Sequence, residues 1–167
     1  MTDAVSHGWT GWRVALTVIV GVVGAALLPP VMGETGRDVI MHAFSGVCHQ
    51  LPERSAHIGG VPLALCDRCL GIYGGVALGI LAFPAMPGMA YRLHRRAGML
   101  LVVALTPLAL DWAGPVIGTW PNVPWSRAVT GLLFGAAAGV LVGRAAAHWN
   151  RTRAAEAAPD DRADAGP

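Results

Sequence analysis

Residues 70–90 read LGIYGGVALGILAFPAMPGMA and contain no charged side chain. A helix needs roughly 20 consecutive apolar residues to cross a bilayer, with about 17 as the lower limit, so this stretch predicts a transmembrane helix. Three more apolar stretches run from about 12 to 31, 98 to 117 and 128 to 143. The last is marginal in length, but Trp125 and Trp149 flank it like interfacial anchors. The sequence therefore predicts an all-α integral membrane bundle of about four transmembrane helices.

The composition supports a membrane protein. Hydrophobic residues make up 54% of the 167 residues and charged residues only 13%, against about 25% charged in soluble domains. The net charge of +2 gives no argument for a nucleic-acid partner, so the expected partner is the lipid bilayer. We expect one membrane domain over residues 1–150. The segment 151–167 is rich in Ala, Asp, Arg and Pro without periodicity and is expected to be a disordered cytoplasmic tail.

The first stretch is expected to be a retained anchor and not a cleaved signal peptide, because its charged n-region is a single Arg13 and no small-x-small cleavage site precedes polar sequence. With the N-terminus inside, eight arginines become cytoplasmic: Arg13, Arg92, Arg95, Arg96, Arg144, Arg151, Arg153 and Arg162. Four become external: Arg37, Arg54, Arg68 and Arg127. This excess satisfies the positive-inside rule. It predicts a multi-pass protein of the cytoplasmic membrane with both termini in the cytoplasm and the 32–69 loop outside.

Glycines recur at every fourth position in two of the stretches. They are Gly71, Gly75 and Gly79 in the second and Gly131, Gly135, Gly139 and Gly143 in the fourth. Small residues at this spacing let two helix backbones approach closely in a membrane. The pattern predicts that the second and fourth helices pack against each other.

The outer loop, residues 32–69, carries all three cysteines of the chain. The spacing of apolar residues over 37–47 predicts a short helix on the membrane surface. Ile58-Gly59-Gly60-Val61 predicts a tight hairpin, which leads into Cys66-Asp67-Arg68-Cys69. A Cys-x-x-Cys after a hairpin is typical of a metal knuckle, because the turn aims both sulfurs at one point.

Two interpretations of the cysteines remain open. In the first, Cys48, Cys66 and Cys69 bind a metal ion, with zinc as the default and another transition metal as the alternative. The fourth ligand would be His49, His57, Asp111 or water. In the second, Cys66 and Cys69 form a reversible disulfide, since Cys-x-x-Cys pairs exchange readily. A static disulfide or a closed zinc staple without turnover is the structural alternative.

Six polar residues are candidates for a catalytic role beside the cysteines. They are Asp111, Arg127, Asn122, Tyr73, Arg54 and Arg68. Asp111 lies about six residues inside its helix, where an ionisable group is costly and is a functional candidate by default. Its alternative role is a packing hydrogen bond to Thr106 or a tryptophan. Tyr73 lies one turn from Cys69 on the same helix face.

The pattern Cys48-His49-Gln50-x-Pro52-x-Arg54-Ser55, with Cys66-x-Arg68-Cys69-x-Gly71-x-Tyr73-x-Gly75 after it, resembles the predicted membrane proteins catalogued as domain of unknown function 2085. The similarity covers roughly residues 37–143 and includes Asp111, Asn122, Arg127 and Thr130-Gly131. It is looser in the third helix, where the family has a glutamine shortly after the aspartate and residues 112–114 do not. The resemblance implies a prokaryotic membrane protein with a shared polar site and names no reaction.

Three functions follow from these alternatives. The first is a metal-binding membrane protein, with zinc as the expected ion, whose site lies on the extracytoplasmic face. The second is a thiol–disulfide oxidoreductase linked to a membrane quinone, which is implied by the resemblance in outline, four helices with a Cys-x-x-Cys at an outer helix end, to the bacterial quinone-dependent disulfide-forming enzymes. The third is a non-catalytic membrane scaffold stapled by zinc or by a disulfide. Whether the protein is an enzyme is left open by the sequence.

Overall fold

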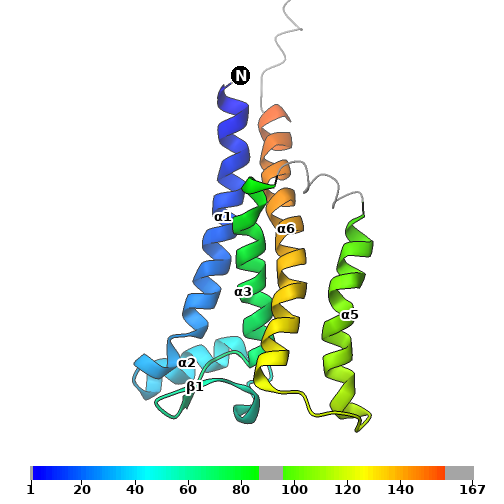
Figure 1. The fold of residues 1–167 in the computed structure, drawn as a ribbon. Coiled ribbons are helices and arrows are strands. Elements are labelled where there is room, and N and C mark those ends of the chain that lie inside the picture. The colour runs from blue at the N-terminus through cyan, green and yellow to red at the C-terminus, as the bar shows by residue number, and fades with distance from the viewer. Residues whose placement is uncertain (1, 87–95, 157–167) are drawn as a thin grey trace, which may run out of the picture.

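Four long helices form the body of the protein. The computed structural model describes residues 2–86 and 96–156. The long helices are α1 (Thr2–Ala26), α3 (Asp67–Ala82), α5 (Ala97–Val116) and α6 (Pro124–Glu156). Figure 1 shows α1, α3 and α6 running side by side, with α5 beyond α6. The predicted all-α bundle is confirmed.

The long helices have the length and composition of membrane spans. Residues Asp67–Ala85, Ala97–Val116 and Pro124–Trp149 each meet the requirement for crossing a bilayer, and α1 contributes the shorter apolar run Thr10–Ala26. Only 22%, 17% and 28% of the three apolar windows is buried inside the protein. The rest of this apolar surface needs lipid as its solvent.

Two helix boundaries differ from the sequence expectation. The fourth stretch, expected to end near Gly143, is part of one continuous helix of 33 residues that ends at Glu156. Ala145, Ala146 and Ala147 favour helix whether or not lipid surrounds them, so loss of hydropathy marks the membrane boundary and not the helix end. The helix thus enters the segment expected to be a disordered tail, whose remainder, 157–167, lies outside the described residues. The second helix ends at Ala82 and is followed by the 3-10 turn η3 (Phe83–Ala85). The rest of the predicted stretch, residues 87–90, lies outside the described residues. So do Arg92 and Arg95, which the sequence assigned to the cytoplasmic side.

The glycine pattern brings α3 and α6 into backbone contact, as predicted. A Cβ atom added at Gly75 would meet the backbone of Leu132 and Ala136, and one added at Gly135 would meet the backbone of Ile72. Gly71, Gly79, Gly131 and Gly139 have equally close backbone neighbours across the interface, whereas a Cβ at Gly143 would lie 3.2 Å from the side chain of Phe83. Only a residue without a side chain fits at such positions. The α3–α6 pair is therefore the rigid support on which the start of α3, with its cysteines, is held.

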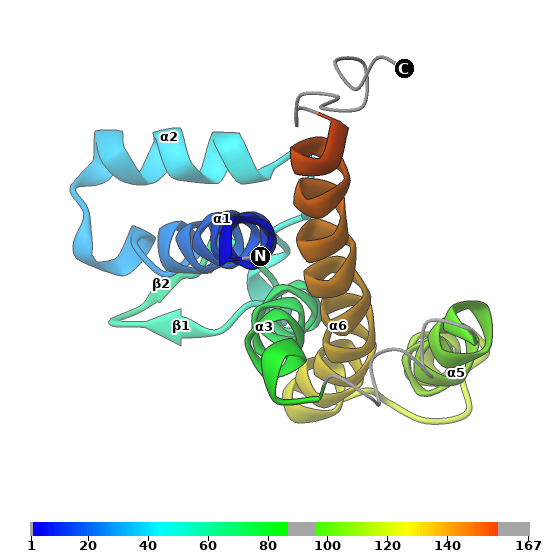
Figure 2. The same cartoon turned by 90° about the horizontal axis from the view of Figure 1, so that it is seen from above.

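Short elements close one end of the bundle, which we call the cysteine end (residues 27–69 and 117–127). They are η1 (Pro29–Val31), α2 (Glu34–Phe44), η2 (Pro52–Arg54), β1 (His57–Ile58) and β2 (Val61–Pro62). Helix α2 lies across the end of α1, at a steep angle to it (Figures 1 and 2). It starts three residues before the predicted segment, since Gly33 occupies the N-cap and Glu34 suits the first turn. The predicted hairpin is confirmed, with Ile58 opposite Val61 and positive φ at Gly59 and Gly60.

Helix α5 is attached to the bundle at one place. Figure 2 shows it apart from α1 and α3, with α6 as its neighbour. Of its residues only Asp111 and Gly114 are buried. Trp120, from the following loop, covers Gly114 so closely that a Cβ there would overlap the indole. Both buried residues lie near the cysteine end, so α5 is held there and faces lipid along most of its length.

Candidate metal centre

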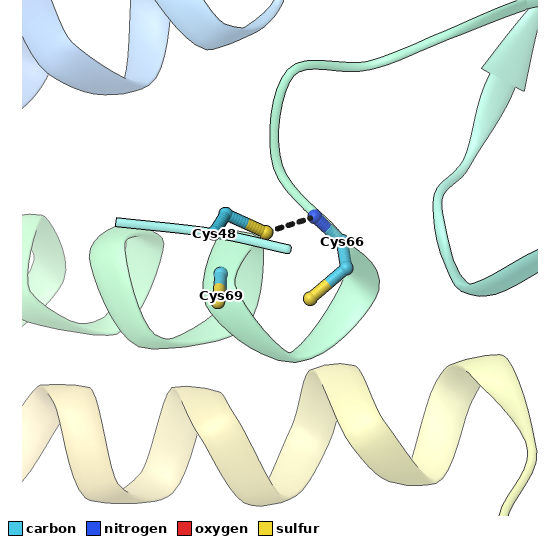
Figure 3. A group of neighbouring side chains, drawn as sticks. All are labelled: Cys48, Cys66 and Cys69. Atoms are coloured by element: carbon cyan, nitrogen blue, oxygen red, sulfur yellow. Dashed lines mark hydrogen bonds between the residues drawn. The ribbon is translucent and has the colours of Figure 1, made fainter. Parts of the chain in front are cut away.

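The three cysteines come together although 18 residues separate Cys48 from Cys66. Their Sγ atoms all lie within 4.8 Å of one another. Three thiolates on one tetrahedral zinc ion, with Zn–S bonds of about 2.3 Å, would be about 3.8 Å apart. Figure 3 shows Cys48 on its own segment opposite the first turn of α3, which carries the other two. Cys48 is buried, and Cys66 and Cys69 are half-buried. This group has the dimensions of a metal site.

Local structure fixes each cysteine. Cys48 follows the end of α2, where its backbone N–H donates to the carbonyl of Phe44 at 3.0 Å. Cys66 is the N-cap of α3, and Cys69 lies in its first turn. The segment from the hairpin to Cys66 is anchored in turn, because Ala64 donates to the carbonyl of Ala26 at the end of α1. The group thus joins α1, α2 and α3.

Two backbone N–H groups are directed at the Cys48 sulfur. Its Sγ accepts the N–H of Cys66 at 3.3 Å and the N–H of Gln50 at 3.5 Å. Figure 3 shows the first of these bonds. Two N–H donors therefore hold this buried sulfur in place beside Cys66 and Cys69.

Gln50 holds the segment that follows Cys48 in place by hydrogen bonds, a role that was not predicted from the sequence. Its φ of 50° lies in the left-handed region, which is uncommon outside glycine. Its side-chain Nε2 donates to the carbonyl of Met41 at 2.8 Å and to that of Ala64 at 3.1 Å. One side chain therefore ties α2 to the segment before Cys66. The only sign of this role in the sequence is that Gln50 stands two residues after Cys48 in Cys48-His49-Gln50.

The Cys-x-x-Cys pair is electrostatically asymmetric. A hydrogen bond from the Cys69 side chain, helped by one from its backbone and one from the Cys48 side chain, lowers the pKa of Cys66 from 9.0 to about 5. Burial acts in the opposite direction and is outweighed. The N-cap position at α3 also favours a negative charge. Cys66 is therefore a thiolate near neutral pH, as both metal binding and thiol exchange require.

The other proposed metal ligands lie outside the three-sulfur group. His49 is exposed and lines the neighbouring pocket. The ring of His57 is engaged with the carbonyl of Ser55 at 2.9 Å. The carboxylate of Asp111 is occupied by an arginine and a serine. Among the described residues, the atoms that converge are the three sulfurs alone.

A pocket of about 320 Å³ adjoins the sulfurs. Its lining includes the three cysteines together with Arg54, Arg68 and Arg127. His49 and Trp112 lie at the same pocket. The structure thus brings the cysteines and three of the six candidate polar residues to one cavity.

Asp111 belongs to an ion-pair network between helices. Its Oδ2 lies 2.5 Å from Nη2 of Arg68, and its Oδ1 accepts the hydroxyl of Ser126 at 2.6 Å. The side chain of Asn122 donates to the Asp111 backbone carbonyl at 3.2 Å. Thr106 instead donates to Val102 in its own helix. Ser126, in the first turn of α6, was not predicted, since a single serine carries no pattern that predicts a partner.

Arg127 and Tyr73 have different surroundings. Arg127 is buried and forms an ion pair with Asp67, with 3.7 Å between Nε and Oδ2. Tyr73 packs against the buried cluster that includes Cys48, Ala64 and Leu65. Tyr73 therefore packs beside Cys48 as part of its apolar surroundings. It does so from the helix face that the sequence analysis assigned to both Tyr73 and Cys69.

Comparison with known proteins places this arrangement in a family. An uncharacterized protein of Methanocaldococcus jannaschii is 34% identical over 111 residues, which cover 62% of this chain and 70% of that protein. No solved structure matches the chain. The family described as predicted membrane protein DUF2085 matches residues 48–141, from the first cysteine into α6. The chain therefore belongs to the DUF2085 family of predicted membrane proteins.

Proposed function

We propose that this protein is a multi-pass membrane metalloprotein that binds one zinc ion through Cys48, Cys66 and Cys69. The observation that carries the proposal is the Cys48 sulfur, which is buried, accepts two backbone N–H groups and lies within 4.8 Å of both other sulfurs. A disulfide between any two of the cysteines would leave the third without a partner. A metal ion uses all three, and thiolate ligands favour zinc among the common divalent ions.

The fourth coordination position is proposed to face the pocket. Zinc sites with three protein ligands keep a position for water or substrate, whereas structural sites have four. The adjacent cavity and the absence of a fourth converging ligand among residues 10–86 and 96–149 support an open site. Bound there, zinc would polarise an oxygen atom that enters from the pocket. Asp111, Arg68 and Asn122 would hold the wall of the site in place.

The proposed site lies on the extracytoplasmic face of the cytoplasmic membrane. If both termini are cytoplasmic, the order of the apolar stretches in the sequence assigns eight of the twelve arginines to the cytoplasmic side. The cysteine end then carries the other four, as the positive-inside rule expects.

Metal analysis with a free-thiol count on the detergent-purified protein tests this function. We expect one zinc per chain, and three alkylatable thiols after chelation and unfolding. Cys66→Ser should lose the metal, whereas Ser45→Ala, in the same loop, should retain it. A protein with no metal and a single free thiol would overturn the proposal in favour of a Cys66–Cys69 disulfide.

A second candidate is thiol–disulfide exchange, which the lowered pKa of Cys66 favours. Oxidation of the Cys66 thiolate and the Cys69 thiol to a disulfide releases two electrons and one proton. A membrane quinone would accept the two electrons and this proton, and with a second proton from solvent it would become the quinol. The same measurement separates the two candidates, because the redox protein would gain two thiols on reduction without binding metal.

A further inference from the structure

We propose that the pocket beside the cysteines binds the phosphate group of a ligand through Arg127 and Arg54. The proposal names a ligand class for the site described above and rests on that proposed function. Arg127 forms part of the pocket wall and Arg54 lies at its exposed edge.

Arg127 is a buried cation with unused hydrogen-bonding capacity. The residue is only 7% exposed, and its Nε is buried without a hydrogen-bond partner. Asp67, its ion-pair partner, is 3.7 Å from Nε, which is beyond hydrogen-bonding distance. Within the described chain the Arg127 side chain donates to no acceptor. Buried charged donors normally have hydrogen-bond acceptors. Since Arg127 lines the pocket, a ligand in the pocket can supply the acceptor that the protein does not.

The neighbouring arginines indicate which acceptor fits. Arg68 also has a buried Nε without a hydrogen-bond partner, but its Nη2 is paired with Asp111, so its guanidinium is fixed in the pocket wall. Arg54 is exposed, and within residues 2–86 and 96–156 its side chain forms no hydrogen bond or ion pair that would compete with a ligand. Two available guanidinium groups at one cavity offer more donors than a single carboxylate can accept. A phosphate group has enough oxygens to take a planar fork from each arginine.

The net charge of the pocket indicates that a phosphate would be held by hydrogen bonds more than by overall electrostatic attraction. Asp67 and Asp111 offset two of the three arginines, and a zinc ion with three thiolates carries one net negative charge. The loaded pocket is therefore close to neutral. Affinity should then depend on the hydrogen bonds of Arg127 and Arg54 more than on ionic strength.

The surroundings of the pocket suit a phosphate that comes from lipid as well as one from solution. Trp112 lines the pocket and is 58% exposed, and Leu51 and Val47 contribute exposed apolar surface at the same cavity. Tryptophan and apolar side chains at the end of a membrane bundle are typical of the lipid headgroup level. The shared chemistry is the phosphate, and the experiment distinguishes its source.

Calorimetric titration of the zinc-loaded protein in non-ionic detergent tests the proposal. The probes are inorganic phosphate, dihexanoyl phosphatidic acid and, as a phosphate-free control, dihexanoylglycerol. We expect phosphatidic acid to bind and dihexanoylglycerol not to bind. Equal affinity for inorganic phosphate would identify a soluble ligand, and much weaker affinity would identify a lipid. Failure of both phosphate probes to bind would overturn the proposal.

Matched variants identify the residues responsible. Arg127→Gln should weaken phosphate binding about tenfold or more, and Arg127→Lys should recover part of it, because lysine keeps the charge without the fork. Arg54→Gln, at an exposed position, should weaken binding without affecting folding. Arg13→Gln removes the same charge from the exposed surface of α1 and should have no effect. Unchanged affinity in Arg54→Gln and in a folded Arg127→Gln or Arg127→Lys would refute the assignment.

Zinc content measured on each sample separates this inference from the function on which it rests. Protein with zinc that binds neither phosphate probe would leave the metal site intact and refute the phosphate site. Protein without zinc that still binds phosphate through Arg127 would refute the metal site alone.

Discussion

The carboxylate of Asp111 lies 2.5 Å from the guanidinium of Arg68, the residue between Asp67 and Cys69 in the Cys-x-x-Cys motif. Asp111 is on α5 and Arg68 is on α3. The second carboxylate oxygen accepts the hydroxyl of Ser126, on α6. One side chain therefore connects three helices at the cysteine end. Because α5 has few other buried contacts, this connection holds it to the bundle.

Asp111→Asn should destabilise the bundle without removing the metal. The change leaves the Arg68 guanidinium, 18% exposed, without its partner. Loss of one partner from a buried ion pair costs about 3–5 kcal/mol. We expect a lower thermal midpoint in detergent and an unchanged zinc content, since the three sulfurs are not altered.

Ser126→Ala is the control for this prediction. It removes one hydrogen bond to the same carboxylate and keeps the ion pair, so it should cost about 1 kcal/mol. Equal midpoints for Asp111→Asn and the parent protein would show that the pair does not hold α5. Loss of zinc from a folded Asp111→Asn protein would instead make Asp111 part of the metal site.

Gly75→Ala should separate α3 from α6. The added methyl group would lie 2.8 Å from the backbone nitrogen of Ala136, which cannot move without displacing the helix. Gly74→Ala is the matched control on the same helix, because its Cβ would have no neighbour within 4 Å. We expect Gly75→Ala to lower the thermal midpoint, and Gly74→Ala to leave it unchanged or to raise it, as alanine favours helix. Similar midpoints for the two variants would contradict the packing.

Features that depend on local pattern were predictable from the sequence. The apolar stretches gave the helices, the fourfold glycine spacing gave the α3–α6 interface, and Gly59-Gly60 gave the hairpin. The clustering of the cysteines in one loop predicted that their three sulfurs come together. Each of these signals lies within a few residues of chain, where spacing alone determines geometry.

Features that depend on packing between distant segments were not predictable. Arg68 and Asp111 are 43 residues apart, and only the arrangement of α3, α5 and α6 brings them together. The hydrogen bonds of Gln50 likewise require α2 and the segment before Cys66 to be in place. The length of α6 was missed for another reason, since hydropathy reports lipid contact and the helix continues beyond it.

Gln50→Ala should speed the loss of metal. It removes the hydrogen bonds to Met41 and Ala64 but keeps a non-glycine residue at φ 50°. Gln50→Gly removes the same bonds and relieves a backbone strain of about 1–2 kcal/mol. Zinc release to a chelator should therefore be slowest in the parent, intermediate in Gln50→Gly and fastest in Gln50→Ala. Equal rates in the parent and Gln50→Ala would show that Gln50 does not hold the loop.

The orientation inferred from the arginines is open to a direct test. A reporter that is active only in the cytoplasm, fused after α6, should be active, and one that requires export, inserted at the Gly59-Gly60 turn, should also be active. That turn is exposed at the tip of the hairpin, so an insertion there disturbs little. The opposite pattern of activity would invert the topology and place the cysteines in the cytoplasm.

Alkylation of Cys66 in metal-free protein should depend little on pH. With a pKa of about 5, Cys66 is almost entirely thiolate from about pH 7 to pH 9, so its reaction rate with iodoacetamide should stay nearly constant there. Cys69→Ala removes the donor that contributes most to the lowered pKa and should move the pKa toward 9.0. The thiolate fraction of Cys66, and with it the rate, should then rise about tenfold per pH unit up to that value. Quantifying the modified Cys66 peptide by mass spectrometry measures both profiles. A tenfold rise per pH unit already in the parent protein would show that Cys66 is an ordinary thiol and that Cys69 does not activate it.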